Sequence, residues 1–197
     1  MNDNSRCNKP PASGTSDSQL SANKSSQEWL DIVDENDKVT GRATREEIHR
    51  LKLMHRSVHI MLHDSRGSWF VQKRSLLKKT GAGLWDASVA GHVDSGETYR
   101  QCALREIDEE LGIQVADSAL IPCGHLRPSA ANGFEFTDMF LFTSDAELTL
   151  APDEIDDGRW LDTDELSAWL VASPEEFTGV FLTVWSHALC RYQSRGG

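Results

Sequence analysis

Three glutamates close together near the middle of the chain have the residue type and spacing of a divalent-metal site. They lie in the segment GHVDSGETYRQCALREIDEELGI, which spans residues 91–113. A helix is expected from Thr98 to Leu111, because Thr98 and Gln101 form a capping-box pattern and Gly112 is a typical helix terminator. At about 100° per residue, one stripe beside the apolar face of this helix carries Glu106, Glu109 and Glu110.

Converging carboxylates repel one another and raise each other's pKa unless a cation lies between them. Oxygen ligands of this type suit Mg²⁺ or Mn²⁺, which would neutralise phosphate charge and activate a water molecule. A solvated acidic helix face is the alternative, since glutamate is a good helix former. The spacing favours the metal site, because Glu97 follows Gly91 after five residues and Arg105 follows Glu97 after seven residues.

The segment resembles the Nudix box at every defined position. The resemblance implies an α/β fold, namely a Nudix-type α/β/α sandwich with a mixed sheet. It also implies a set of metal ligands, which are Glu106, Glu109, Glu110 and the backbone carbonyl of Gly91. Arg105 is a further catalytic candidate, which would pair with Glu97 and brace the loop, while Gly112 would end the helix. The alternative for Arg105 is an ordinary surface arginine.

The function implied by this resemblance is that of a hydrolase acting on phosphoric anhydride bonds. Such a protein would be Mg²⁺-dependent and would cleave a diphosphate bond of a nucleoside diphosphate-type or related small substrate by water attack on phosphorus. The alternative is a non-catalytic diphosphate-binding module. An inactive relative would be expected to lack one of the box glutamates, and this sequence keeps all of them.

Outside the box, the stretch from Trp29 to Trp185 resembles the branch of isopentenyl-diphosphate isomerase. The signs are WLDIVDENDKVTGRA, MHRSVHIMLHD, the QKRS end of a strand and LWDASVAGHVDSGE. The isomerase uses a cysteine directly before the Gly-His pair of the box, where this chain has Ala90. A methyl group neither donates nor accepts a proton, so isomerase activity is the weaker alternative.

The same resemblance points to a second metal site built from histidines and glutamates. The matching histidines are His49, His55 and His92. Glu135 matches one of the isomerase glutamates, and Thr137 stands in place of the other. For each histidine taken alone, a hydrogen-bonded structural role is the more common alternative.

Other candidates could shape a substrate pocket. Glu154 precedes an expected strand and could act as a base, or could be an acidic loop residue. Four basic side chains near a glycine loop could receive phosphates, or could belong to a solvated loop: Lys73, Arg74, Lys78 and Lys79. Phe134 and Phe136 could stack on a base, although strand phenylalanines more often belong to the core.

The sequence also predicts the order of the elements. Residues 1–27 are rich in Ser, Asn and Pro and are expected to form a disordered tail. Residues 28–53 are expected to form a hairpin and a helix, with Thr44 and Glu47 as a capping box. Residues 54–191 are expected to form the Nudix hydrolase domain. Its strands are predicted at 57–64, 69–75, 84–91, 119–127, 134–143 and 157–161, and its later helices at 163–171 and 174–191.

Composition limits the partners. The chain has 20 basic and 31 acidic residues, a net charge of −11, so its surface repels nucleic-acid backbones and a small-molecule diphosphate is the expected partner. No apolar run is long enough for a membrane span, and no signal-peptide pattern occurs, so a cytoplasmic location is expected. We expect free thiols at Cys7, Cys102, Cys123 and Cys190. The sequence leaves the oligomeric state open.

Overall fold

The computed structural model describes residues 28–196 of the chain. The predicted disordered tail at residues 1–27 and the predicted thiol at Cys7 lie outside the described residues. Within the described part, Cys102, Cys123 and Cys190 are free thiols, as predicted.

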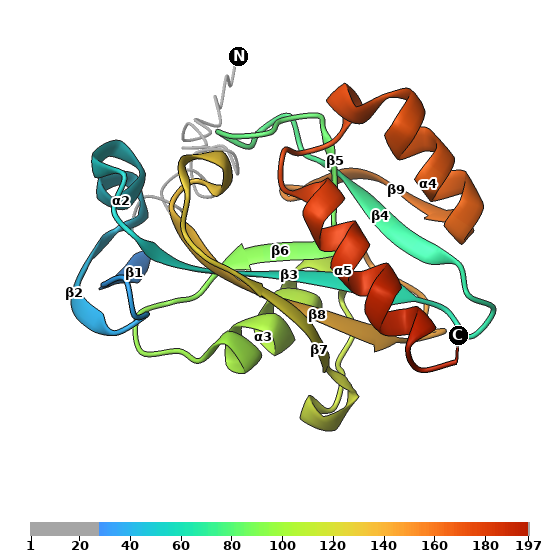
Figure 1. The fold of residues 1–197 in the computed structure, drawn as a ribbon, viewed down its shortest axis with the longest axis horizontal. Coiled ribbons are helices and arrows are strands. Elements are labelled where there is room, and N and C mark those ends of the chain that lie inside the picture. The colour runs from blue at the N-terminus through green and yellow to red at the C-terminus, as the bar shows by residue number, and fades with distance from the viewer. Residues whose placement is uncertain (1–27, 197) are drawn as a thin grey trace, which may run out of the picture.

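The N-terminal extension is a hairpin followed by a short helix. β1 (Trp29–Val33) and β2 (Val39–Thr44) pair antiparallel as a separate two-stranded sheet. The turn between them is closed by Asp34, whose carboxylate accepts hydrogen bonds from the backbone N–H groups of Asn36 and Lys38. α2 (Arg45–Leu51) begins at the predicted capping box, in which Thr44 and Glu47 bond each other's backbone N–H groups. Figure 1 shows this extension at one end of the molecule.

The main sheet has seven strands and is mixed. Its central strand is β3 (His55–His63), which pairs in parallel with β8 (Glu135–Thr143) along its whole length. On its other side β3 pairs antiparallel first with β6 (Val89–His92) and then with β4 (Trp69–Arg74). The remaining strands pair with β8 or β4 and are β7 (Ile121–Leu126), β5 (Trp85–Asp86) and β9 (Ile155–Leu161).

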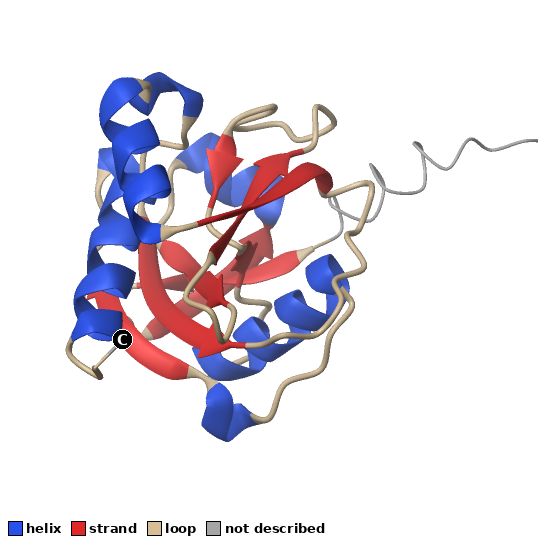
Figure 2. Cartoon of the chain, turned by 90° about the vertical axis from the view of Figure 1, so that its right-hand side faces the viewer, coloured by secondary structure: helices blue, strands red, loops and turns tan. Residues whose placement is uncertain are grey.

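Helices cover both faces of this sheet, as Figure 2 shows. Along β3 the alternate residues Val58, Ile60 and Leu62 are fully buried in the apolar cluster that includes Ile107 of α3 (Tyr99–Leu111). Met61 points to the opposite face and joins a second cluster. That cluster includes residues of α4 (Thr163–Ala172) and α5 (Phe181–Gln193). The predicted α/β/α sandwich with a mixed sheet is therefore confirmed.

The prediction of one strand over residues 84–91 is wrong, because the chain leaves one pairing partner for another at Ser88. The Ser88 hydroxyl donates to the Phe70 carbonyl and accepts from the Leu62 N–H, so a side chain replaces ladder bonds at this point. The segment is therefore split into β5, which pairs with β4, and β6, which pairs with β3.

The helix predicted over 174–191 begins too early. Residues Pro174–Glu176 form a 3₁₀ turn, and α5 begins only at Phe181. Between them, Phe177 forms a bridge with Trp85 and the Thr178 N–H donates to the Trp85 carbonyl, so these residues extend the sheet rather than a helix. The other predicted strands and helices are confirmed to within about three residues at each end. Within residues 28–196, no helix has the length and apolar character needed to cross a membrane.

Candidate functional site

A cleft of about 1240 Å³ collects most of the predicted site residues. Its walls come from the N-terminal extension, the start of β3, strand β6, helix α3, the loop after β4 and the segments around residues 133, 154 and 179. Parts of the chain that are far apart in the sequence therefore contribute to one concave surface, which is the usual setting of a small-molecule site.

Helix α3 forms where the sequence predicted it. Thr98 and Gln101 complete the capping box at its start, and Gly112 ends it with a left-handed φ of 67°. A side chain at Gly112 would be strained by this φ and would collide with Thr149, so glycine is required there. These local signals fix the rotation of the helix, which carries Glu106 and Glu110 against the sheet with exposed fractions of 9% and 4%.

The burial of these two glutamates disfavours their charged forms. Burial raises the pKa of Glu106 to about 7, even though the neighbouring Arg105 guanidinium opposes the shift. Burial and the charge of Glu106 raise the pKa of Glu110 to about 8, against the opposing effects of Lys78 and Gln72. Two buried acids that resist ionisation, yet meet in one cleft, have the donor set that a hard divalent cation would stabilise.

Glu109 differs from the other two box glutamates because half of its side chain is exposed. One of its oxygens accepts from the Arg105 guanidinium at 3.3 Å. The structure therefore brings the three predicted ligands into one cleft, while their roles as ligands stay predictions.

Arg105 braces the loop before α3, as the sequence predicted. Its Nε and Nη2 donate to the two carboxylate oxygens of Glu97 at 3.1 and 2.9 Å, and Nη2 also donates to the His92 carbonyl at 3.1 Å. Its Nη1 donates to Glu106 at 2.7 Å. The guanidinium thus fixes the loop and one box carboxylate at the same time.

Gly91 is required by contact with the helix rather than by its backbone conformation. A Cβ built at Gly91 would overlap the carboxyl group of Glu106. The absence of a side chain therefore lets the Glu106 carboxyl lie directly against the backbone of β6, close to the carbonyl that is predicted to complete the metal site.

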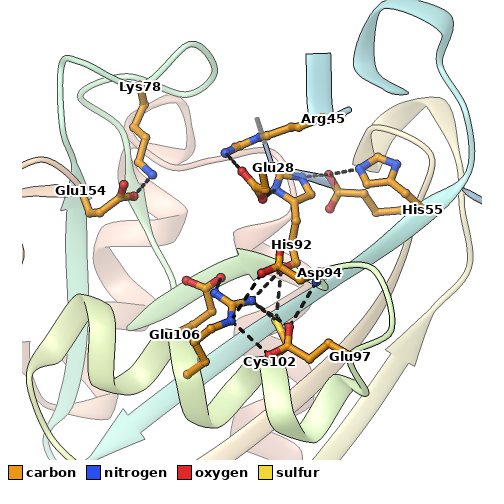
Figure 3. Close-up of polar contacts among 12 residues, drawn as sticks. Glu28, Arg45, His55, Lys78, His92, Asp94, Glu97, Cys102, Glu106 and Glu154 are labelled. Atoms are coloured by element: carbon orange, nitrogen blue, oxygen red, sulfur yellow. Dashed lines mark hydrogen bonds and ion pairs between the residues drawn. The ribbon is translucent and has the colours of Figure 1, made fainter. Parts of the chain in front are cut away.

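A second group of potential ligands lies on the other side of β6. One ring nitrogen from each of His49, His55 and His92 lies within 4.8 Å of the others. The parallel pairing of β3 with β8 places Glu135 beside them, and its Oε1 is 3.6 Å from His55 Nε2 and 3.5 Å from His92 Nε2. Figure 3 shows the side chains of His55 and His92 near each other in this part of the cleft.

Two buried ring nitrogens of this group could bind a cation or a proton. The Nδ1 of His55 bonds the Leu53 carbonyl at 2.9 Å and so carries its proton there, which leaves Nε2 as a lone pair facing the cluster. Within residues 28–196, the Nε2 atoms of His55 and His92 are buried without a hydrogen-bond partner. Burial, together with His92 and His55, lowers the pKa of His49 to about 4, so its ring is neutral and free to act as a ligand near pH 7.

The pKa of Glu135 shows the same balance of forces. Burial disfavours its charge, but the adjacent rings of His55 and His92 outweigh burial and hold its pKa well below the usual value. Thr137, which stands where a second glutamate was expected in the isomerase pattern, is fully buried and bonds the Ser57 hydroxyl at 2.8 Å. The histidine group therefore has one carboxylate partner from β8, not two.

The opposite wall of the cleft carries two cations, Arg74 and Lys78, each paired with a carboxylate. Lys78 forms an ion pair with Glu154, and Arg74 Nη1 donates to Asp86 at 3.2 Å. Figure 3 shows the Lys78–Glu154 pair across the cleft from His55. Of the four predicted phosphate-binding residues, only Arg74 and Lys78 line the cleft.

Four other predicted contributors do not reach the cleft. The Lys73 ammonium lies over the ring of Trp85, and Lys79 is exposed. Phe136 is buried and stacks on His125, so the core alternative for it is confirmed. Phe134 has a left-handed φ of 66° at the turn before β8 and does not line the cleft.

Several cleft residues carried no signal strong enough to be found from the sequence. Glu28 joins the two halves of the site, because its carboxylate bonds Arg45 at 3.0 Å and lies 3.9 Å from His92 Nδ1. Gln72 Nε2 donates to Glu110 at 3.0 Å. His59 on β3 pairs with Ala90 on β6, and the His59 Nδ1, which has no hydrogen-bond partner among the described residues, is 3.8 Å from Asp86. The alternation of polar residues at the start of β3 is the only local hint of these roles.

Comparison with known proteins identifies the family. The Nudix domain family model matches residues 53–179, which include the whole of the box. The chain belongs to the Nudix hydrolases. An uncharacterised Nudix hydrolase of Yersinia pestis is 35% identical over 150 residues, which cover 72% of this chain and 76% of the relative.

Two further relatives agree with the wider resemblance. An isopentenyl-diphosphate Delta-isomerase of Serratia proteamaculans is 30% identical over 159 residues, covering 80% of this Nudix chain and 89% of the relative. A crystal structure of a Deinococcus radiodurans protein is 31% identical with a TM-score of 0.71, and the match covers 82% of this chain and 99% of that chain. Nudix hydrolases cleave pyrophosphate bonds in nucleoside diphosphate derivatives, so this protein is a hydrolase acting on phosphoric anhydride bonds.

The raised pKa of Glu110 predicts a pH-dependent stability in the metal-free protein. The folded state holds a proton on Glu110 up to about pH 8, whereas the unfolded chain releases it near 4.5. The folded state is stabilised by its higher affinity for this proton, and this stabilisation is fully present below about pH 4.5 and is lost as the pH rises toward about 8. In urea unfolding between about pH 5 and pH 8, wild type should lose stability relative to Glu110→Gln, and Mg²⁺ should restore it more strongly at the higher pH.

Asp108→Asn is the matched control, because Asp108 is an exposed residue of the same helix. Its stability should follow that of wild type at each pH. Parallel pH profiles for wild type and Glu110→Gln would contradict the prediction.

Proposed function

We propose that this Nudix hydrolase is a Mg²⁺-dependent pyrophosphatase that cleaves a diphosphate bond of a nucleoside diphosphate-type substrate by water attack on phosphorus. One observation supports it most strongly. Glu106 and Glu110 are both buried and line the large cleft, with Glu109 beside them, and burial raises the pKa values of Glu106 and Glu110.

The residues present fit a hard divalent cation. Glu106 and Glu110 would hold it, with Glu109 and the Gly91 carbonyl as further oxygen ligands. When bound, such an ion neutralises charge on the phosphate oxygens and lowers the pKa of a bound water. The protein's own contribution is to fix these carboxylates, which Arg105 does for Glu106 and Gln72 does for Glu110.

The wall that carries Arg74 and Lys78 would receive the substrate. Arg74 and Lys78 are both paired with carboxylates in this structure, so a diphosphate can replace the Glu154 side chain as the partner of Lys78 without leaving a cation buried alone. Release of Glu154 from Lys78 would free its carboxylate inside the cleft, where a base is needed. The alternative of a non-catalytic binding module is weaker, because every box glutamate is present and positioned.

The central test is Glu110→Gln. Loss of an outer-shell partner of a metal ligand costs about 10–100-fold, so loss of this ligand should lower kcat/KM for nucleoside diphosphates by more than about 100-fold. Phosphate release should be measured with Mg²⁺ against a panel of nucleoside diphosphates and their derivatives. Asp108→Asn on the same helix is the control and should retain full activity. Equal turnover by Glu110→Gln and wild type would contradict the proposal.

Isomerase activity is not expected, although an isomerase is among the relatives. Ala90 lies on β6 opposite His59 and provides no thiol to the cleft. Incubation of the protein with isopentenyl diphosphate, Mg²⁺ and Mn²⁺ should yield no dimethylallyl isomer by NMR. Robust conversion would show that another group replaces the missing thiol.

We also propose that His49, His55 and His92, together with Glu135, hold a second cation. The two unpartnered buried Nε2 atoms and the adjacent carboxylate support it. Imidazole ligands suit a transition metal, so Co²⁺ should give a visible absorption band that persists in Glu110→Gln. His92→Asn should weaken that band, whereas His125→Asn should not, because His125 pairs with Asp138 outside the cleft. Identical Co²⁺ spectra for wild type and His92→Asn would contradict this site.

A further inference from the structure

Trp29 presents an unusually exposed aromatic ring to the cleft. It is the first residue of β1, its exposed fraction is 48%, and it lines the cleft near the box loop. The other large exposed tryptophan is Trp160 on β9, which packs against Phe70 and does not line the cleft. Its exposed indole is an apolar surface inside the cleft, and a planar ligand that covered it would bury that surface from water.

The guanidinium of Arg42 lies over the Trp29 ring. Asp31 pairs with Arg42 and Trp29 pairs with Thr44, so Trp29 and Arg42 are diagonal neighbours on one face of the hairpin. The guanidinium carbon lies 5.3 Å from the centre of the Trp29 ring. Arg45, Arg74 and Lys78 have carboxylate partners, whereas no carboxylate within residues 28–196 pairs with Arg42. Arg42 is therefore a cleft cation whose charge is free for a ligand.

The strand that carries the ring is held in a fixed place relative to the box. The Trp29 carbonyl accepts from the Ser95 N–H at 2.8 Å, and the next residue, Leu30, is fully buried and bridges to Asp94. The Asp31 carboxylate accepts from the Ser95 hydroxyl at 2.6 Å and from the Gly96 N–H at 3.2 Å. These bonds tie β1 to the loop that leads into α3, so the backbone of Trp29 has a fixed position relative to the helix that carries the box glutamates.

We propose that Trp29 and Arg42 form the base-binding subsite of this enzyme, a surface that stacks the nucleobase of the nucleoside diphosphate substrate. This inference rests on the proposed hydrolysis and names its substrate class. A planar base gains from stacking on an indole and on a guanidinium, whereas an aliphatic chain would desolvate the arginine without compensation. The subsite and the box carboxylates line the same cleft, so one nucleoside diphosphate could contact the subsite with its base and the carboxylate site with its phosphates.

The test compares ligands that differ only in the base. AMP and CMP are the probes with a base, and ribose 5-phosphate is the probe without one, each measured by isothermal titration calorimetry with Mg²⁺. Base stacking on an aromatic side chain is worth enough that Trp29→Ala should weaken AMP and CMP binding by about tenfold or more. Binding of ribose 5-phosphate should not change, which also shows that the variant is folded.

Three further variants sharpen the result. Trp29→Phe keeps an aromatic face and should retain most of the affinity for AMP, and Trp160→Ala removes the exposed tryptophan outside the cleft and should leave all three affinities unchanged. Arg42→Ala should weaken AMP binding more than ribose 5-phosphate binding. Equal losses for AMP and ribose 5-phosphate in Trp29→Ala would overturn the subsite, as would AMP affinity equal to wild type.

The probes contain no phosphoric anhydride, so this experiment does not depend on turnover. If base-dependent binding through Trp29 is found but no diphosphate is cleaved, the subsite holds and only the proposed hydrolysis fails. If diphosphates are cleaved and Trp29→Ala binds AMP like wild type, the hydrolysis holds and the subsite is wrong.

Discussion

Glu106 and Glu110 are buried on one face of α3, and the burial of these two carboxyl groups constrains the residues around them. Gly91 has no side chain because the Glu106 carboxyl occupies that space. Gln72 is a buried residue of β4 and turns its amide toward Glu110. A folded protein keeps such an arrangement against its electrostatic cost when a ligand stabilises it, and a divalent cation is the ligand that these oxygen donors suit.

The N-terminal extension completes this site rather than merely preceding it. Arg45 and Glu28 bond each other between the box and the histidine group, and His49 comes from the adjacent helix α2. His92 belongs to both halves, because its carbonyl accepts from Arg105 and its ring joins the histidines. A movement of β6 would therefore disturb the glutamates and the histidines together, which makes one strand the mechanical link between two potential cation sites.

The parts of this structure that could be predicted are those with local causes. The capping boxes at Thr44 and Thr98 and the terminator Gly112 fix helices within a few residues, so the carboxylate stripe was predictable from spacing alone. The end of a strand at Ser88 and the delayed start of a helix at Phe177 depend on contacts with Phe70 and Trp85, and no local sequence pattern predicts these contacts. Glu135 reaches His55 through a parallel pairing across 80 positions of sequence, so only the family resemblance suggested their meeting.

Thr137 and Ala90 change the chemistry of the cleft in the same direction. The Thr137 and Ser57 hydroxyls satisfy each other, so this part of the floor is neutral where a second carboxylate would add negative charge beside Glu135. A less negative floor is easier for a diphosphate to approach, and it leaves any cation at the histidines less neutralised and better able to attract phosphate oxygens. Ala90 removes the thiol from the same surface. Neither residue therefore supplies the second carboxylate or the thiol that the isomerase resemblance would require of this wall.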